Sequence, residues 1–166
     1  MTLPVKRANA AICKQGHVVS PALWLMEPTQ FCAECGEQVE TSCRECGAAI
    51  PGRMYDVLPV TGRKRLKPGA FSRPGFCVIC GAPFPWVDRG ELISELIKRL
   101  DEEDLAPDEK LTAREQLEAL SDPDLSEDEQ KERWQRVRAI APKFLTASGR
   151  ILERLAGEAI RQTLGL

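Results

Sequence analysis

The sequence predicts two regions of different construction: a small cysteine-rich domain with little regular β-structure at residues 1–87, and an all-α region of about four helices at residues 88–166. All seven cysteines and the one histidine lie in the first region, with most of the glycine and proline. The second region carries apolar residues at helical spacing. Together these observations predict a zinc-stabilised domain, of the zinc-ribbon or tandem-knuckle type, followed by a helical C-terminal region.

The cysteines have the spacing of metal ligands. Three pairs share the form Cys-x-x-Cys-Gly, and the remaining cysteine has a histidine four residues further on. An odd number of cysteines, falling in close pairs, argues against a disulfide framework. Eight ligands complete two tetrahedral sites with none left over. The sequence therefore predicts two bound Zn²⁺ ions, with the ligands Cys13, His17, Cys32, Cys35, Cys43, Cys46, Cys77 and Cys80.

A Cys-x-x-Cys-Gly segment can form a tight knuckle in which both sulfurs face one ion, and the glycine accommodates a positive φ. A region rich in glycine and proline buries little apolar surface, so bound zinc would supply folding free energy. Two other interpretations stay open. Cys13 and His17 could be a buried thiol and an ordinary histidine, and a Cys-x-x-Cys pair could be a redox centre, although no βαβ pattern accompanies it.

Which pairs share an ion is not fixed by the spacing. Sequential grouping, our prediction, joins the Cys13/His17 pair to the second pair and the third pair to the fourth. Cross-brace grouping joins the first to the third and the second to the fourth. A last grouping joins the two central pairs across a loop that is short for a ribbon hairpin.

The C-terminal region has clear helix signals. Asp88 with Glu91, and Ser126 with Glu129, have the spacing of capping boxes, and Pro107 and Pro142 can open helices. Apolar residues recur at helical spacing after each start. We expect the core-facing positions to be Leu92, Ile93, Leu96, Ile97 and Leu100, then Leu111, Leu117 and Leu120, then Trp134, Val137 and Ile140, and in a single last helix Phe144, Leu145, Ile151, Leu152, Leu155, Ile160 and Leu164.

The cysteine-rich part also resembles a known family. The segments that carry the likeness are Ala11–Ser20, Phe31–Gly36, Thr41–Cys46 with Ile50–Gly52, and Phe76–Trp86. In their order they are similar to a family of bacterial zinc-ribbon proteins of unknown function, over about residues 10–90 with a similar helical tail. The resemblance implies metal sites and no particular reaction.

Enzymatic function is not expected. Four protein ligands would close each zinc site, whereas a catalytic zinc keeps an open position. With His17 on a metal, no histidine remains as a general base, and the sequence has no phosphate-binding or dinucleotide motif. We therefore expect a binding module, an adaptor with an unidentified protein partner.

The alternative function is nucleic-acid binding. A basic segment, expected to be a loop at residues 63–67, would contact phosphates through Arg63, Lys64, Arg65 and Lys67. The acidic pI of about 5.6 argues against it. The longest uncharged stretch, Gln15 to Met26, is interrupted by Ser20 and Pro21, so no membrane span is predicted and the cytoplasm is the expected location.

Overall fold

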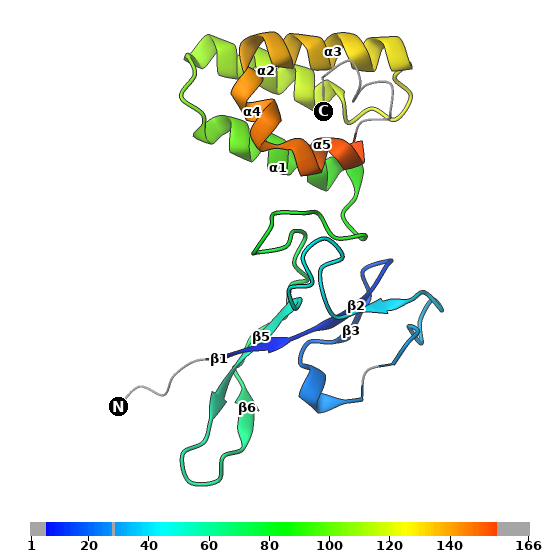
Figure 1. Cartoon of the computed structure of the whole chain (residues 1–166), viewed down its shortest axis with the longest axis vertical. Helices are drawn as coiled ribbons and strands as arrows, with labels where there is room; N and C mark the ends of the chain where they lie inside the picture. The colour runs from blue at the N-terminus through cyan, green and yellow to red at the C-terminus, as the bar shows by residue number, and fades with distance from the viewer. Residues whose placement is uncertain (1–5, 28, 156–166) are drawn as a thin grey trace. The chain divides into compact units, whose positions relative to one another are not determined.

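The computed structural model describes residues 6–27 and 29–155. The chain divides into two compact units, with the division between Val87 and Asp88. The first unit consists of short strands and turns, and the second consists of helices (Figure 1).

The N-terminal unit contains two antiparallel sheets, each of three short strands. One has the order β1-β5-β6 and the other β3-β2-β4. A single 3₁₀ turn, η1 (Leu23–Leu25), follows β3. The strand bounds are β1 Lys6–Asn9, β2 Ala11–Cys13, β3 Val18–Ser20, β4 Val39–Glu40, β5 Pro51–Val57 and β6 Lys64–Leu66.

The sheets correct two expectations. Regular β-structure is more extensive than predicted, because strands of two to seven residues pair with partners distant in sequence and show no long apolar alternation. The basic segment at residues 63–67 is also not simply a loop. Its central residues form β6, in which Leu66 pairs with Tyr55 and Arg65 with Asp56.

The core of the N-terminal unit combines small side chains with branched ones. The buried residues include Ala8, Ala10, Ile12 and Ile50. Close backbone approach depends on Gly52, where an added Cβ would lie 2.3 Å from the carbonyl oxygen of Pro21. The core of this unit thus contains few large apolar side chains.

The C-terminal unit contains five helices in its described part, and the first four begin where we expected. Asp88 and Ser126 both cap their helices, and each takes part in a complete capping box. Pro107 and Pro142 stand at first helical positions. The bounds are α1 Arg89–Glu102, α2 Pro107–Ala119, α3 Glu127–Ile140, α4 Pro142–Ala147 and α5 Gly149–Leu155.

The single last helix that we expected from Pro142 is instead two helices. Helix α4 ends before Ser148, whose N–H bonds to the carbonyls of Phe144 and Leu145, and α5 begins at Gly149. Glycine is a poor helix former, so interrupting the helix at Gly149 costs little free energy. The expected positions Ile160 and Leu164 lie outside the described residues.

Most of the expected core positions are buried in this unit. Helix α2 contacts both α1 and α3, and α5 contacts α1. Leu111 is an exception, because its side chain is 59% exposed. Fully buried side chains include Leu96, Leu100, Leu117, Leu120, Trp134, Phe144, Ile151 and Leu152. None of the helices described in either unit is long and apolar enough to cross a membrane.

Candidate metal centres

The first candidate centre is built around the β2–β3 hairpin. Strand β2 ends at Cys13, and the chain turns back so that the N–H of Cys13 donates to the carbonyl of His17 at 3.0 Å. Gly16 makes this turn with a φ of 88°. The N–H of His17 donates to the Cys13 sulfur at 3.3 Å. Cys13 and His17 are thereby held on the same turn.

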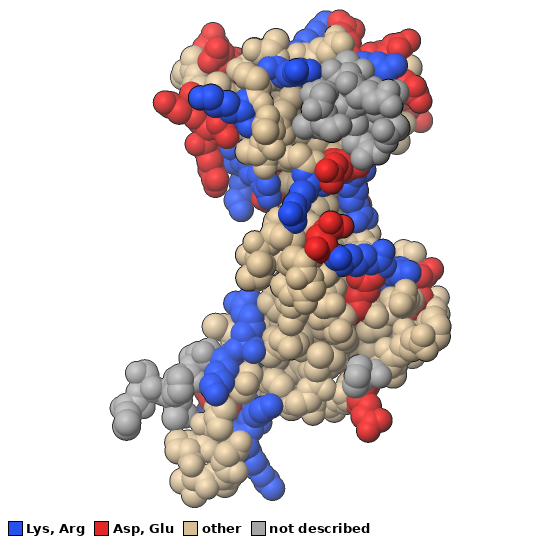
Figure 2. All heavy atoms as spheres, viewed as in Figure 1, with Lys and Arg blue, Asp and Glu red and all other residues tan. Residues whose placement is uncertain are grey.

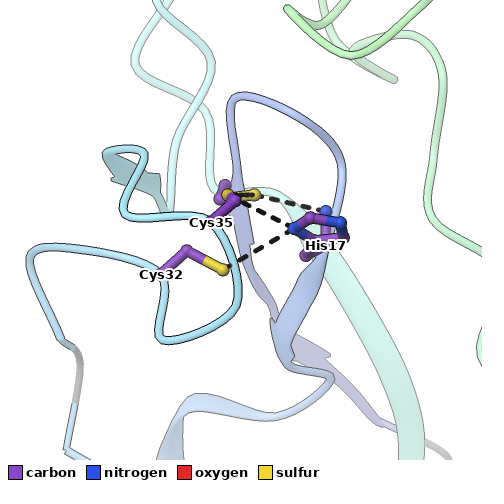
Figure 3. Close-up of side chains that lie close together, drawn as sticks. His17, Cys32 and Cys35 are labelled. Atoms are coloured by element: carbon purple, nitrogen blue, oxygen red, sulfur yellow. Dashed lines mark hydrogen bonds between the residues drawn. The ribbon is translucent and has the colours of Figure 1, made fainter.

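Two more ligands reach this turn from the next knuckle. Figure 3 shows His17, Cys32 and Cys35 pointing toward one another. His17 Nδ1 lies 3.3 Å from the Cys35 sulfur and 3.8 Å from the Cys32 sulfur, and the sulfurs of Cys13 and Cys35 are 3.7 Å apart. All four ligand atoms lie within 4.8 Å of one another.

The second candidate centre joins the third and fourth pairs. The sulfurs of Cys43 and Cys80 are 3.7 Å apart, and those of Cys46 and Cys77 are 3.6 Å apart. These separations are far beyond the ~2.05 Å of a disulfide. All seven cysteines are free. The two tetrads, Cys13/His17/Cys32/Cys35 and Cys43/Cys46/Cys77/Cys80, could each hold a metal ion.

The three Cys-x-x-Cys-Gly segments adopt one backbone structure. In each, the first cysteine accepts a hydrogen bond at its carbonyl from the glycine N–H, and its own N–H donates to the carbonyl of the residue five positions on. A single β-bridge closes the turn, as Phe31 with Gln38 does in the first. Gly36, Gly47 and Gly81 have φ between 71° and 73°, a region that side chains with a Cβ rarely adopt.

The strand pairing explains which pairs share a centre. Strand β2 pairs with β4, so that Cys13 is opposite Val39, just beyond the knuckle that carries Cys32 and Cys35. The N–H of Lys14 also bonds to the carbonyl of Gln38. The structure therefore groups the pairs sequentially, and it brings the ligands together in neither of the other two arrangements.

Backbone N–H groups of the knuckles lower the pKa of two of the thiols. The N–H of Glu34 is the main cause that lowers the pKa of Cys32 to about 7. At Cys77 burial opposes ionisation, but backbone N–H groups of Cys80 and Ile79 prevail and the pKa is lowered to about 7.

The pKa values of the partner thiols move the other way. The N–H of Glu37 favours the Cys35 thiolate, but burial and neighbouring thiols outweigh it and raise the pKa to about 11. At Cys46 the N–H of Ala48 also favours the thiolate. Burial and the adjacent thiols have the larger effect and raise the pKa of Cys46 to about 12. Several thiolates together repel one another, so full ionisation of either tetrad requires a cation.

The sequence did not single out Glu34, which lies beside the first centre. Its carboxylate is 3.8 Å from His17 Nε2, the ring nitrogen that does not face the sulfurs. A carboxylate on the second nitrogen of a ligating histidine fixes the ring's tautomer. The sequence does place Glu34 between the ligands Cys32 and Cys35, and this position could have indicated a carboxylate close to the first centre.

The four basic residues do not approach either tetrad. Lys64 Nζ lies 4.8 Å from the ring centre of Trp24 and 5.7 Å from that of Tyr55. Arg65 and Lys67 lie 3.9 Å and 3.6 Å from the carboxylate of Asp56. Arg63 is exposed at the end of the β5–β6 hairpin.

The fold and site define a protein with a small β unit that carries two candidate metal centres, and with a helical unit. A sequence model of the family described as an uncharacterized protein conserved in bacteria (DUF2321) matches residues 6–164. The chain belongs to that family, which confirms the resemblance to a bacterial family without an assigned function. No curated protein and no solved structure matches the chain.

Proposed function

We propose that this chain is a structural zinc-binding module that acts as a protein-interaction adaptor in a bacterial cytoplasmic complex. The observation that carries the proposal is the pair of complete tetrads, each offering four ligand atoms within 4.8 Å of one another. Three thiols with an imidazole, and four thiols, are the donor sets of structural zinc sites.

The separations between ligand atoms fit zinc. With Zn–S bonds of about 2.3 Å, tetrahedral geometry places two sulfurs about 3.8 Å apart, and a nitrogen and a sulfur about 3.5 Å apart. The observed values are 3.6–3.7 Å between sulfurs and 3.3–3.8 Å from His17 Nδ1 to sulfur. Small rearrangements would suffice to bind an ion in either tetrad.

A stabilising role is favoured over a catalytic one. Each tetrad has four protein donors, so a bound ion would have no open position for water or substrate. The chain's one histidine is a member of the first tetrad and is not available as a general base. The zinc would hold the knuckles in place and would take no part in a reaction.

Exposed apolar residues on a metal-held turn support a role in protein binding. Val78 and Ile79, between the ligands Cys77 and Cys80, are 69% and 74% exposed. Aliphatic side chains on a constrained turn lose little conformational entropy when they bind a partner. Because they are adjacent, these two side chains form one exposed apolar patch.

Nucleic-acid binding is the second candidate function, favoured by the Trp24, Tyr55 and Lys64 cluster. Aromatic rings beside cations can stack on bases and contact phosphates. However, Lys64 already lies over the Trp24 ring, and Asp56 lies near both Arg65 and Lys67. Fewer free cations remain than the sequence suggested, so we rank this function below protein binding.

Cross-linking from within a knuckle tests the adaptor proposal. A photoreactive residue would replace Ile79 in the full chain, expressed in a bacterium that encodes it, and a matched control would replace the similarly exposed Leu111. We expect a discrete protein adduct from position 79 that survives nuclease and is absent from position 111. An adduct removed by nuclease would favour the second candidate, and equal adducts at both positions would contradict a specific interface.

A further inference from the structure

A hollow of about 390 Å³ lies in the N-terminal unit beside the β1-β5-β6 sheet. Its walls come from β1, β5, the segment after β6 and the last knuckle, through Arg7, Met54, Lys67, Phe71 and Val78. None of these residues is a member of a tetrad. The hollow is therefore a separate feature that meets the metal-held part of the unit at Val78.

The charge around this hollow is positive. Arg7 is exposed, and Arg53 also lines the hollow, its guanidinium donating to the carbonyl oxygen of Lys67. Of the lining residues in the described chain, none carries a carboxylate. A neighbouring hollow shares Lys67 and adds Arg65, with Asp56 as its one acidic residue. Figure 2 shows Lys and Arg side chains gathered over β5 and β6. Such a surface favours an anionic ligand.

The same hollow has apolar walls. Met54 is 45% exposed and Val78 is 69% exposed, and Phe71 is half-buried between them in sequence. A ligand that carried charge alone would leave these side chains in water. A ligand with an aliphatic group between its anionic groups would cover them, and methionine adapts well to such groups.

One wall offers free main-chain groups. Residues 69–72 lie between Pro68 and Pro74, and no hydrogen bond joins their main chain to another residue that the structure describes. Extended peptides bind beside such segments, because each unpaired N–H and C=O can pair with the ligand's main chain. A ligand with its own main chain could pair with these groups along their length, whereas a small anion could not.

We propose that this hollow binds an acidic, extended peptide segment of a partner protein. One aliphatic side chain of the peptide packs against Met54 and Val78, and a flanking carboxylate pairs with Arg7, while Lys67, already 3.6 Å from Asp56, adds to the positive charge of the rim. This inference rests on the adaptor function proposed above and names the chemistry of its partner. Nucleic acid fits less well, because the exposed apolar side chains of the hollow, Met54 and Val78, are not aromatic, and the aromatic ring of Phe71 is half-buried.

Fluorescence anisotropy on the zinc-loaded full chain tests this proposal. The probe is a fluorescein-labelled octapeptide in which glutamate alternates with leucine, and the matched probes replace glutamate by lysine or leucine by serine. We expect binding of the Glu/Leu peptide alone. Arg7→Glu should weaken it about tenfold, because attraction becomes repulsion, and Met54→Ser should weaken it about fivefold through lost apolar contact.

Arg63→Glu is the control, since it makes the same charge change as Arg7→Glu in the same unit but outside both hollows. At physiological salt, charges more than about 8 Å apart are largely screened, so its effect should stay within about twofold. Absence of Glu/Leu binding up to about 1 mM, or weakening by Arg63→Glu equal to that by Arg7→Glu, would overturn the proposal. So would displacement of the peptide by a single-stranded oligonucleotide that binds more tightly.

Zinc counting by native mass spectrometry on the same samples separates the two proposals. Two ions per chain with no peptide binding, and with the protein adduct from position 79 intact, would reject the peptide site and leave the adaptor function standing. Fewer than two ions in fully loaded protein, or no protein adduct from position 79, would reject the adaptor proposal itself.

Discussion

The backbone N–H of Lys14 donates a hydrogen bond to the carbonyl oxygen of Gln38, at 3.1 Å. Lys14 directly follows the ligand Cys13, and Gln38 closes the knuckle that carries Cys32 and Cys35 through its bridge to Phe31. This bond, with the β2–β4 pairing, places the first two ligand pairs beside each other. The backbone pairing and the first tetrad therefore agree on the sequential grouping.

Pairwise removal of cysteines should therefore distinguish the groupings. Cys32→Ser with Cys77→Ser disrupts both tetrads, whereas Cys32→Ser with Cys35→Ser disrupts only the first. We expect essentially no tightly bound zinc in the former variant and one ion per chain in the latter, by native mass spectrometry. One ion retained by the former would mean that Cys32 and Cys77 share a site, as in the cross-brace arrangement.

Removal of metal should affect the two units differently. Chelation takes away the ions proposed to stabilise the small β core, while the helices of the second unit keep their own apolar core. We expect loss of dispersed amide NMR signals from residues 6–87 with helical circular dichroism largely retained. If the helical signal disappears in parallel, the two units fold as one cooperative structure.

The knuckle glycines should resist substitution. At Gly36 the φ of 73° strains any residue with a Cβ, although no atom stands in its way. Gly36→Ala should destabilise the zinc-loaded N-terminal unit by about 1–2 kcal/mol, measured by thermal unfolding. Gly149→Ala is the control, because that glycine lies in a helix with space around it. An equal loss at both positions would exclude backbone strain as the cause.

Two leucines of α2 offer a matched test of the helical core. Leu117 is fully buried, whereas Leu111 is 59% exposed on the same helix. Leu117→Ala should destabilise the unit by about 2–5 kcal/mol through lost contact and a cavity. Leu111→Ala should change stability by no more than about 0.5 kcal/mol. Urea unfolding followed by circular dichroism measures both, and similar losses would show that Leu111 is covered in solution.

Acid should weaken the N-terminal cap of α3. The Ser126 side chain and N–H donate to the Glu129 carboxylate and lower its pKa below the ordinary value of 4.5. Because the folded-state pKa is the lower one, this stabilisation is present above the unfolded-state pKa and is lost as pH falls through the folded-state pKa.

Carboxyl NMR titration tests the cap. In Ser126→Ala the Glu129 pKa should rise toward 4.5, and the stability difference between wild type and variant should shrink as the pH falls below about 4. An unchanged Glu129 pKa in the variant would show that the Ser126 hydroxyl does not contribute to the shift.

Local signals in the sequence predicted all eight candidate metal ligands and four helix starts. Cysteine spacing indicated the tetrads, because ligand pairs on one turn are neighbours in sequence. The capping residues Asp88 and Ser126 bond to residues three positions further on, so the sequence indicated these helix starts equally clearly. Both features depend on short stretches of chain.

Non-local features were missed for the opposite reason. Strand β6 has the sequence Lys-Arg-Leu, and only its pairing with β5 makes it a strand. The position of Asp56 near Arg65 and Lys67 follows from that pairing, so the basic segment seemed freer in the sequence than it is. The break at Ser148 lies within a continuous apolar periodicity, which gave no sign of it.

The two tetrads close chain segments of different length. His17 and Cys32 are 15 residues apart in sequence, whereas Cys46 and Cys77 are 31 residues apart. Each doubling of a closed loop adds about 0.6 kcal/mol of entropic cost, so the second centre is the harder one to assemble from an unfolded chain. The segment that it encloses contains the whole β5–β6 hairpin. An ion bound there would join the two ends of this segment, and after its release the pairing of β1 with β5 would be left to hold the hairpin.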